Sequence, residues 1–217
     1  MMDFIGAFSP DNLKFLMEGF MVTLKVAFIS IIFSFIIGGL VGTLRYSKIP
    51  VLSQVLAVVV ETIRNLPLLL IILFTYLALP EVGINLSITV SAIVALTVFE
   101  SAMIAEIVRG GLNSIEKGQM EAARSSGLTY VQSLRTVILP QALRRMVPNL
   151  VSQFISLLKD TSLAIIIALP ELLHHAKIIQ GQSAKYVVPI FLLISLMYFV
   201  VNYALSILAK RLELKRA

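Results

Sequence analysis

Five long apolar stretches divide the chain and predict membrane-spanning helices. They run over residues 13–44, 51–79, 86–108, 147–169 and 186–209. Each is longer than the roughly 20 residues that a helix needs to cross a bilayer. Polar intervals containing basic residues, Gly or Pro separate them, and Ser9-Pro10-Asp11 before the first is typical of a helix start. We therefore expect an all-α integral membrane protein with five transmembrane helices, forming one transmembrane domain over residues 1–217.

The longest polar interval, residues 109–146, is predicted to carry two short helices. A first helix around residues 117–126 would end at Gly127, because glycine adopts the left-handed conformation that closes a helix without strain. Neither short helix could span a bilayer. The pair would therefore lie at the membrane surface, either as solvated helices that anchor their neighbours or as a docking element for a soluble partner.

The second short helix is predicted to begin at Thr129, which has Gln132 three residues later and so the spacing of a capping box. Its apolar stripe would consist of Val131, Leu134 and Ile138. Proline lacks the amide hydrogen that continues a helix, so Pro140 is expected to end it.

Composition agrees with a membrane protein. Of 217 residues 58% are apolar, against the roughly 45–50% of soluble domains, and the mean hydropathy is +0.94. The net charge of +6 does not indicate nucleic-acid binding, because Lys and Arg cluster beside the apolar stretches. The sequence contains no Cys, which excludes disulfides and thiolate metal sites. Its N-terminal stretch lacks the basic region of a signal peptide.

Basic residues occupy alternate intervals, around residues 45–48, 109–145 and 210–216. Basic loops face the cytoplasm, so the N-terminus is expected outside and both the C-terminus and the interval 109–146 inside. The sequence has no GxxxxGK[ST] phosphate-binding loop, and a separate ATPase would have to supply the nucleotide site of any active transport.

Charged residues within the apolar stretches are candidates for a function, since each costs about 2.5–3.5 kcal/mol at the bilayer centre and usually faces the protein interior or a wet cavity. Lys159 and Asp160 lie near the middle of the fourth stretch, and adjacent residues on a helix point too far apart to neutralise each other. In the second stretch Glu61 and Arg64 have the spacing of a pair on one helix face.

Two interpretations of these charges remain open. They could be ion pairs that hold the helices together, or they could line a pathway for a zwitterion, which needs partners of both signs. Asn65 and the nearby Pro67 predict a kinked, partly unwound backbone whose free groups could meet a polar ligand. Asp160-Thr161-Ser162 could cap a half-helix. The candidate substrate-binding residues are Lys159, Asp160, Thr161, Ser162, Glu61, Arg64, Asn65 and Glu100.

Several motifs resemble the permease subunits of ABC importers for polar amino acids. Residues 121–140, which we call the EAA-like segment, contain Glu121-Ala122-Ala123, Gly127 and Ile138-Leu139-Pro140, similar to the family's EAA loop. The resemblance extends to Arg64-Asn65-Leu66-Pro67-Leu68-Leu69, Glu106 with Arg109-Gly110-Gly111, Gly118-Gln119, Leu139-Pro140-Gln141-Ala142 and Lys159-Asp160-Thr161-Ser162-Leu163. Two departures, Asn65-Leu66 for the common Gly-Thr and Ile71-Ile72 where many members have Gln, leave the choice of substrate open.

The resemblance implies a five-helix subunit in the bacterial inner membrane that dimerises with itself or a sister permease. It also implies two ATPase subunits, which bind ATP and magnesium, and an extracytoplasmic amino-acid-binding protein. This chain would hold no cofactor and would not be an enzyme. The ATPase would contact the EAA-like segment, with the candidate coupling residues being Glu121, Ala122, Ala123, Gly127, Leu139 and Pro140. The alternative is a passive channel or a structural subunit of a membrane complex.

Two smaller features have structural interpretations. Gly38 and Gly42 give a small-residue face on which another helix could pack closely. His174 and His175 lack accompanying Cys or acidic ligands and are expected to be a hydrated surface pair instead of a metal site.

Overall fold

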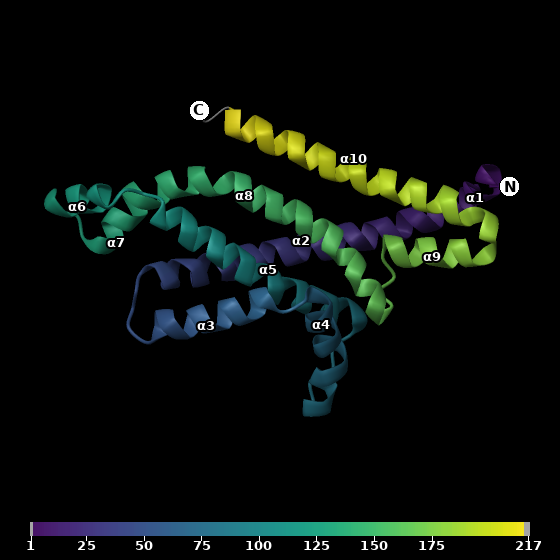
Figure 1. The fold of residues 1–217 in the computed structure, drawn as a ribbon, viewed down its shortest axis with the longest axis horizontal. Coiled ribbons are helices and arrows are strands. Elements are labelled where there is room, and N and C mark those ends of the chain that lie inside the picture. Colours follow the sequence, from purple (N-terminus) through teal and green to yellow (C-terminus); the bar gives the residue numbers. More distant parts are fainter. Residues whose placement is uncertain (1, 215–217) are drawn as a thin grey trace.

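The chain folds into an elongated bundle of helices. The computed structural model describes residues 2–214, with side chains as far as residue 207. Its long helices are α2 (Pro10–Tyr46), α5 (Ile88–Asn113), α8 (Leu139–Asp160) and α10 (Val187–Leu214). The shorter ones are α1 (Phe4–Ala7), α3 (Leu52–Asn65), α4 (Leu68–Leu73), α6 (Lys117–Ser125), α7 (Tyr130–Ser133) and α9 (Leu172–Gln182). Figure 1 shows the four long helices running roughly along the same axis.

Short π- and 3-10-helical segments connect these helices. They are η1 (Phe74–Ala78), η2 (Leu79–Val82), η3 (Leu134–Ile138), η4 (Thr161–Ile167) and η5 (Ala184–Tyr186). Within residues 2–214 no β-strand occurs, so the predicted all-α class is confirmed.

Four helical stretches are long and apolar enough to cross a membrane. They are Pro10–Tyr46, Ile88–Asn113, Tyr130–Ile167 and Ala184–Ile207. A fifth crossing is formed if Leu52–Asn65 and Leu68–Val82, which are bent by 102° at their junction, count as one span. The predicted kink is thereby confirmed. Its cause is Pro67, which disfavours helical geometry in the preceding Leu66 (φ −88°, ψ 142°), and Figure 1 shows α4 turning away from the bundle.

The start of α2 follows the sequence prediction. Ser9 is the N-cap, and its side chain accepts a hydrogen bond from the backbone N–H of Asn12, while Pro10 occupies the first turn. A proline there sacrifices no hydrogen bond because the first helical N–H groups have no partner within the helix.

Helices α2 and α5 meet at the predicted small-residue face. A Cβ atom at Gly38 would lie 2.7 Å from the carbonyl oxygen of Ser101, and one at Gly42 would lie 2.5 Å from that of Ala105. Both positions therefore exclude any larger residue unless the helices separate. The expectation that these glycines serve close packing is confirmed.

Helix α9 folds back against α2 and α10, and apolar side chains of the three helices form a core there. His175 belongs to it, because its ring stacks on Phe15 with the ring centroids 3.8 Å apart and its Nδ1 donates to the carbonyl oxygen of Phe15 at 2.6 Å. The prediction of a hydrated histidine pair is wrong for His175, which is buried. Sequence periodicity showed that adjacent side chains diverge but not that α2 would cover one of them.

The N-terminus of α9 is capped by a buried carboxylate. Glu171 accepts hydrogen bonds from the backbone N–H groups of Leu173 and His174, and from the hydroxyl of Tyr198 at 3.2 Å on α10. Burial raises the pKa of the Glu171 carboxyl, and these donated hydrogen bonds oppose the shift. The carboxylate thus fastens α9 to α10.

Candidate functional site

The EAA-like segment forms a compact helical turn at one end of the bundle. Helix α6 ends as predicted, with Gly127 in the left-handed conformation (φ +88°). Its N–H donates to the carbonyl oxygen of Arg124 at 3.0 Å, and the N–H of Leu128 donates to that of Ala123 at 3.3 Å. These two bonds satisfy carbonyl groups that the helix end would leave free.

The predicted capping box is confirmed in α7. The hydroxyl of Thr129 accepts from the N–H of Gln132 at 3.3 Å, and the N–H of Thr129 donates to the side-chain oxygen of Gln132 at 2.8 Å. This reciprocal pair sets the direction in which the chain re-enters the bundle.

Two expectations for this second helix are wrong. Pro140 does not end it, because the chain passes through the π-helical η3 directly into α8, and Pro140 lies in the first turn of α8. The wider π turn changes the hydrogen-bond register just before the proline. The expected apolar stripe is not buried as one either: Ile138 is buried and Leu134 is half-buried, but Val131 is 68% exposed.

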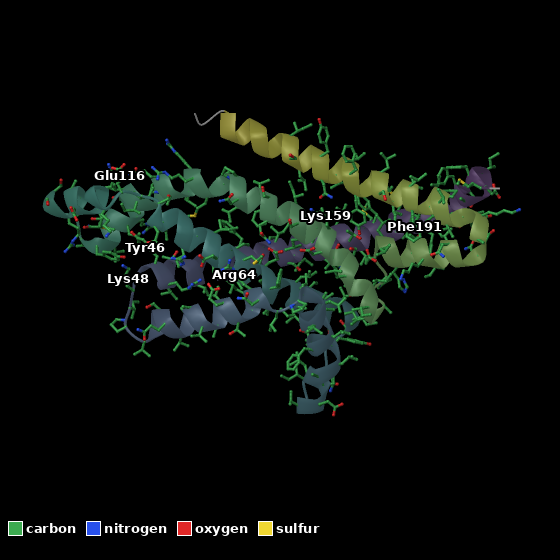
Figure 2. The ribbon with its side chains drawn as sticks, in the orientation of Figure 1. Tyr46, Lys48, Arg64, Glu116, Lys159 and Phe191 are labelled. Atoms are coloured by element: carbon green, nitrogen blue, oxygen red, sulfur yellow. The ribbon has the colours of Figure 1, made fainter. Side chains whose placement is uncertain are left out.

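The candidate coupling residues form a partly exposed surface. Glu121, Ala122, Gly127 and Pro140 are exposed, while Leu139 is half-buried. The exception is Ala123, which is buried and helps to attach α6. Beside them lies a groove of about 370 Å³, whose wall includes Tyr46, Lys48, Glu116, Glu121 and Tyr130. Figure 2 shows Tyr46, Lys48 and Glu116 gathered at this end of the molecule.

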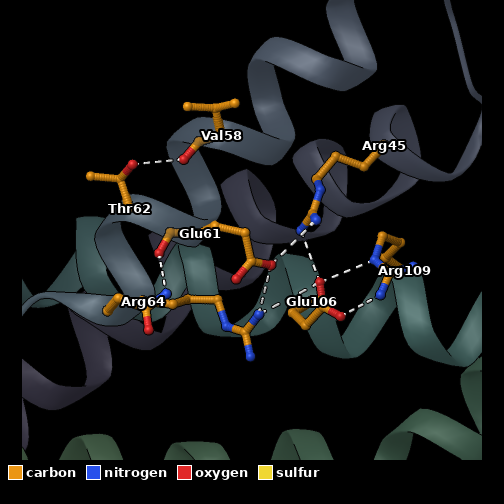
Figure 3. Close-up of polar contacts among 8 residues, drawn as sticks. Arg45, Val58, Glu61, Thr62, Arg64, Glu106 and Arg109 are labelled. Atoms are coloured by element: carbon orange, nitrogen blue, oxygen red, sulfur yellow. Dashed lines mark hydrogen bonds and ion pairs between the residues drawn. The ribbon is translucent and has the colours of Figure 1, made fainter.

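A network of five charged side chains joins α2, α3 and α5 (Figure 3). We call Arg45, Glu61, Arg64, Glu106 and Arg109 the charge network. Glu106 lies at its centre, with Arg45 Nη1 at 2.9 Å and Arg109 Nη2 at 2.5 Å from its carboxylate oxygens. Glu61 and Arg64 pair at 3.0 Å, as their spacing predicted.

A cleft of about 340 Å³ opens beside the charge network, and we call it the α5–α8 cleft. Arg64 and Glu106 contribute to its wall from α3 and α5, and Asn149 and Gln153 from α8. Met103, Ile107, Gly110 and Gly111 complete the lining. The cleft therefore combines charges of both signs, two carboxamides and an apolar strip.

Glu100 is completely buried between α5 and α8. Its Oε1 accepts from the Nε2 of Gln153 at 3.2 Å, and its Oε2 has no hydrogen-bond partner in the described part of the chain. Gln153 also lines the α5–α8 cleft, whereas Glu100 does not, so Gln153 connects the buried carboxyl group to the cleft wall.

The residues around Lys159 lie elsewhere, at the C-terminal end of α8. Lys159 is exposed and Asp160 half-buried, and Figure 2 shows Lys159 well away from Arg64. The proposed capping by Asp160, Thr161 and Ser162 is wrong. The side chain of Asp160 accepts no bond from η4, because α8 continues directly into η4 and the two hydroxyls donate backward, to the carbonyl oxygens of Leu158 and Lys159 at 2.7 Å each.

The structure divides the predicted substrate residues into separate groups. Glu61 and Arg64 form an ion pair, and Asn65 beside them donates to the carbonyl oxygen of Glu61 at 2.7 Å. In contrast, Lys159, Asp160 and Glu100 form no ion pair within the part of the chain that has described side chains. Of the two interpretations of the intramembrane charges, ion pairing therefore explains Glu61 and Arg64 but not Lys159, Asp160 or Glu100.

Sequence reasoning missed several residues that shape this region. They are Arg45 in the charge network and Asn149 and Gln153 in the α5–α8 cleft, and the ion pairs of Glu106 and Arg109, two residues named only for their resemblance to the family, were not predicted either. The spacing of Glu106 and Arg109 (i, i+3) and of Asn149 and Gln153 (i, i+4) is a signal that could have shown two pairs on common helix faces.

Residues 30–217 match the family model described as "Binding-protein-dependent transport system inner membrane component". The chain belongs to this family. The predicted resemblance to ABC importer permeases is thereby confirmed. The family is one of transporters, not of enzymes.

Two relatives from Bacillus subtilis (strain 168) are similar over nearly their whole length. The "Probable glutamine ABC transporter permease protein GlnP" is 69% identical over 217 residues, which cover 99% of this chain and 100% of the relative. The "Probable glutamine ABC transporter permease protein GlnM" is 40% identical over 207 residues, covering 94% and 95%. A solved structure, "Crystal structure of an amino acid ABC transporter with histidines", superposes with a TM-score of 0.90 at 31% identity and covers 99% of both chains.

Proposed function

We propose that this chain is the permease subunit of an ATP-driven importer of polar amino acids and forms its translocation pathway. The observation that carries the proposal is the full-length similarity, in sequence and fold, to permeases and a transporter that are named for amino acids. The relatives are named for glutamine in two cases, which favours a neutral polar substrate. The passive-channel alternative gains no support from these comparisons.

The partners follow from the architecture of such importers. A separate ATPase binds ATP and magnesium, because the sequence of this chain has no phosphate-binding loop. The ATPase docks on the EAA-like segment, whose exposed Glu121, Ala122 and Gly127 lie beside the groove at the end of the bundle. A second permease subunit, identical or a sister chain, and an external amino-acid-binding protein complete the complex.

The orientation rests on charge. Basic residues flank the EAA-like segment and lie between α2 and α3, so this end faces the cytoplasm of a bacterial cell and the N-terminus lies outside the inner membrane. ATP is then available on the side where the ATPase docks.

On its way through the bundle the substrate passes the candidate substrate-binding residues, which lie in two separate regions of the molecule. Lys159, Asp160, Thr161 and Ser162 lie at the end of α8 and the start of η4, while Glu61, Arg64, Asn65 and Glu100 lie around the α5–α8 cleft. A pathway for a zwitterion must offer both signs, and each of the two places contains at least one cation and one carboxyl group.

The proposal is tested by ATP hydrolysis in the assembled complex. The chain is co-expressed with candidate ATPase subunits and purified, and hydrolysis is measured with and without an amino acid and its binding protein. We expect stimulation by the substrate and its loss in Gly127→Asp, which places a charge and a strained left-handed residue on the docking surface.

The matched control is Gly83→Asp. Gly83 has nearly the same conformation (φ +85°) and equally open surroundings, but it lies in the loop after η2, away from the EAA-like segment. This variant should keep the stimulation. Equal loss in both variants, or amino-acid flux through the chain alone in liposomes, would contradict the proposed coupling.

A second experiment addresses the residues at the end of α8. Asp160→Asn removes a negative charge, so it should weaken transport of a cationic amino acid more than that of a neutral one. Competitive uptake with both substrates measures the difference. Equal effects would assign Asp160 a structural role.

A further inference from the structure

The charge network beside the α5–α8 cleft carries an excess of positive charge. The charge network contributes three guanidinium groups (Arg45, Arg64 and Arg109) and two carboxylates (Glu61 and Glu106), which leaves one positive charge in excess. Two of these five side chains, Arg64 and Glu106, line the cleft directly. A small anionic group that enters the cleft is therefore attracted to it.

Arg64 is the residue that can receive such a group. Its pairs with Glu61 at 3.0 Å and Glu106 at 3.8 Å both use the Nη1 atom. Its Nη2 has no ion-pair or hydrogen-bond partner within the described residues, and Arg64 stands in the cleft wall. Since a guanidinium group is well shaped for carboxylates, Nη2 can bind one without breaking the existing pairs.

The part of the wall formed by α8 offers hydrogen bonds instead of charge. Asn149 and Gln153 are separated by four residues, so their carboxamides lie one above the other on the same face of α8. Gln153 donates through Nε2 to Glu100 and keeps its carbonyl oxygen available, while Asn149 is exposed and forms no side-chain hydrogen bond in the described part of the chain. Together they present both donors and acceptors.

We propose that the α5–α8 cleft is a binding site for the transported amino acid, in which Arg64 holds the α-carboxylate and Asn149 with Gln153 selects a neutral polar side chain. This inference deepens the proposed function and rests on it. Met103 and Ile107 cover the aliphatic part of the ligand. The cleft volume of about 340 Å³ lies within the range of small-molecule sites. Lys159 and Asp160 do not contribute to this site.

The test separates recognition of the side chain from recognition of the carboxylate. The complex of permease and ATPase is placed in lipid nanodiscs without a binding protein, and equilibrium binding of radiolabelled L-glutamine is measured in competition with L-norleucine, which lacks the carboxamide. For Asn149→Leu we expect the preference for L-glutamine over L-norleucine to fall about tenfold, the effect of one or two lost hydrogen bonds. Arg64→Gln should weaken both ligands by a similar factor and leave the preference unchanged.

Two further variants control the result. Ser152→Leu makes a similar polar-to-apolar change at an exposed position of α8 that does not line the cleft, and it should retain the preference. Asn149→Gln, which restores a carboxamide, should recover part of it. The inference is overturned if Asn149→Leu and Ser152→Leu give the same preference while the wild-type complex still shows substrate-stimulated ATP hydrolysis. Absence of that stimulation in the wild type for every amino acid would instead overturn the proposed function.

Discussion

Helix α5 holds its neighbours α2 and α3 in different ways. Against α2 the contact is steric, because Gly38 and Gly42 bring the helices so close that a single Cβ atom would overlap backbone oxygens. Against α3 the contact is much looser: of the 14 residues of α3 only Val60 is buried, where it packs on Ala102 and Ala105, and an ion pair of 3.8 Å joins Arg64 to Glu106. The same helix thus belongs to one rigid interface and one adaptable interface.

The difference indicates which part of the bundle can move. Steric contacts act over a few tenths of an ångström, whereas charge interactions weaken gradually with distance. Helix α3 is also bounded by irregular backbone at both ends, with Lys48 (φ 52°) and Val51 (φ 66°) before it and the break at Leu66 after it. We therefore expect α2 and α5 to move as a unit and α3 to shift relative to them.

The largest effect is expected from Gly42→Leu in the steric interface. The side chain would force α2 away from Ala105 and Val108, at a cost of about 3 kcal/mol in the free energy of unfolding. Titration with SDS in mixed micelles measures this change. Gly39→Leu is the control, because no atom lies within 4 Å of a Cβ at Gly39. Equal stability of the two variants would show that the α2–α5 interface is adaptable as well.

Glu106→Gln should have the next largest effect. It removes the nearer of the two carboxylates that pair with Arg45, whose side chain is only 7% exposed, and leaves Glu61 at 3.7 Å as the remaining partner of this buried charge. Because Glu106 itself is partly exposed, we expect a loss of about 2 kcal/mol, below the roughly 3–5 kcal/mol of a fully buried pair. The same SDS titration provides the measurement, and an unchanged midpoint would mean that water already solvates Arg45.

Val60→Ala tests the apolar part of the α3 attachment. Val60 packs in a small cluster with Ala102 and Ala105, and its truncation should cost about 1 kcal/mol, since little else surrounds the cavity. Hydrogen exchange of the α3 amides should increase while exchange in α2 stays constant. Increased exchange in both helices would contradict their independence.

Glu61→Gln should have the smallest effect, because the Glu61 side chain is 51% exposed and its pairs with Arg45 and Arg64 are accessible to solvent. We expect a loss of less than about 1 kcal/mol, which disappears at high salt. Comparing unfolding at low and high ionic strength checks this. A salt-independent loss of several times this size would place Glu61 in the rigid part of the bundle.

The sequence predicted the local backbone structure well at positions where residues nearby in the chain determine it. The cap at Ser9, the left-handed Gly127 and the capping box of Thr129 all depend on residues within one helical turn, and all three are confirmed. The kink before Pro67 is also caused by an adjacent residue, and it too was predicted.

The sequence was less informative where distant elements meet. Burial of His175 depends on α9 folding onto α2, and the contact of Arg45 with Glu106 joins residues 61 positions apart. Helical periodicity contains no information on such pairs. The prediction that Pro140 ends its helix failed for another reason. The π turn before it changes the hydrogen-bond register, and no residue type in the segment indicates such a turn. The coupling and substrate roles stay predictions, to be decided by the variants described above.

The bend at Leu66 has a consequence for how the protein enters its membrane. Helix α3 has 14 residues, about 21 Å in length, and the segment Leu68–Val82 is of similar length, so neither alone reaches across a hydrocarbon layer of about 30 Å. We therefore expect each piece to depend on the other for stable integration. Lengthening the junction at Leu66–Pro67 should impair biogenesis of the chain even where the finished bundle could accommodate the extra residues.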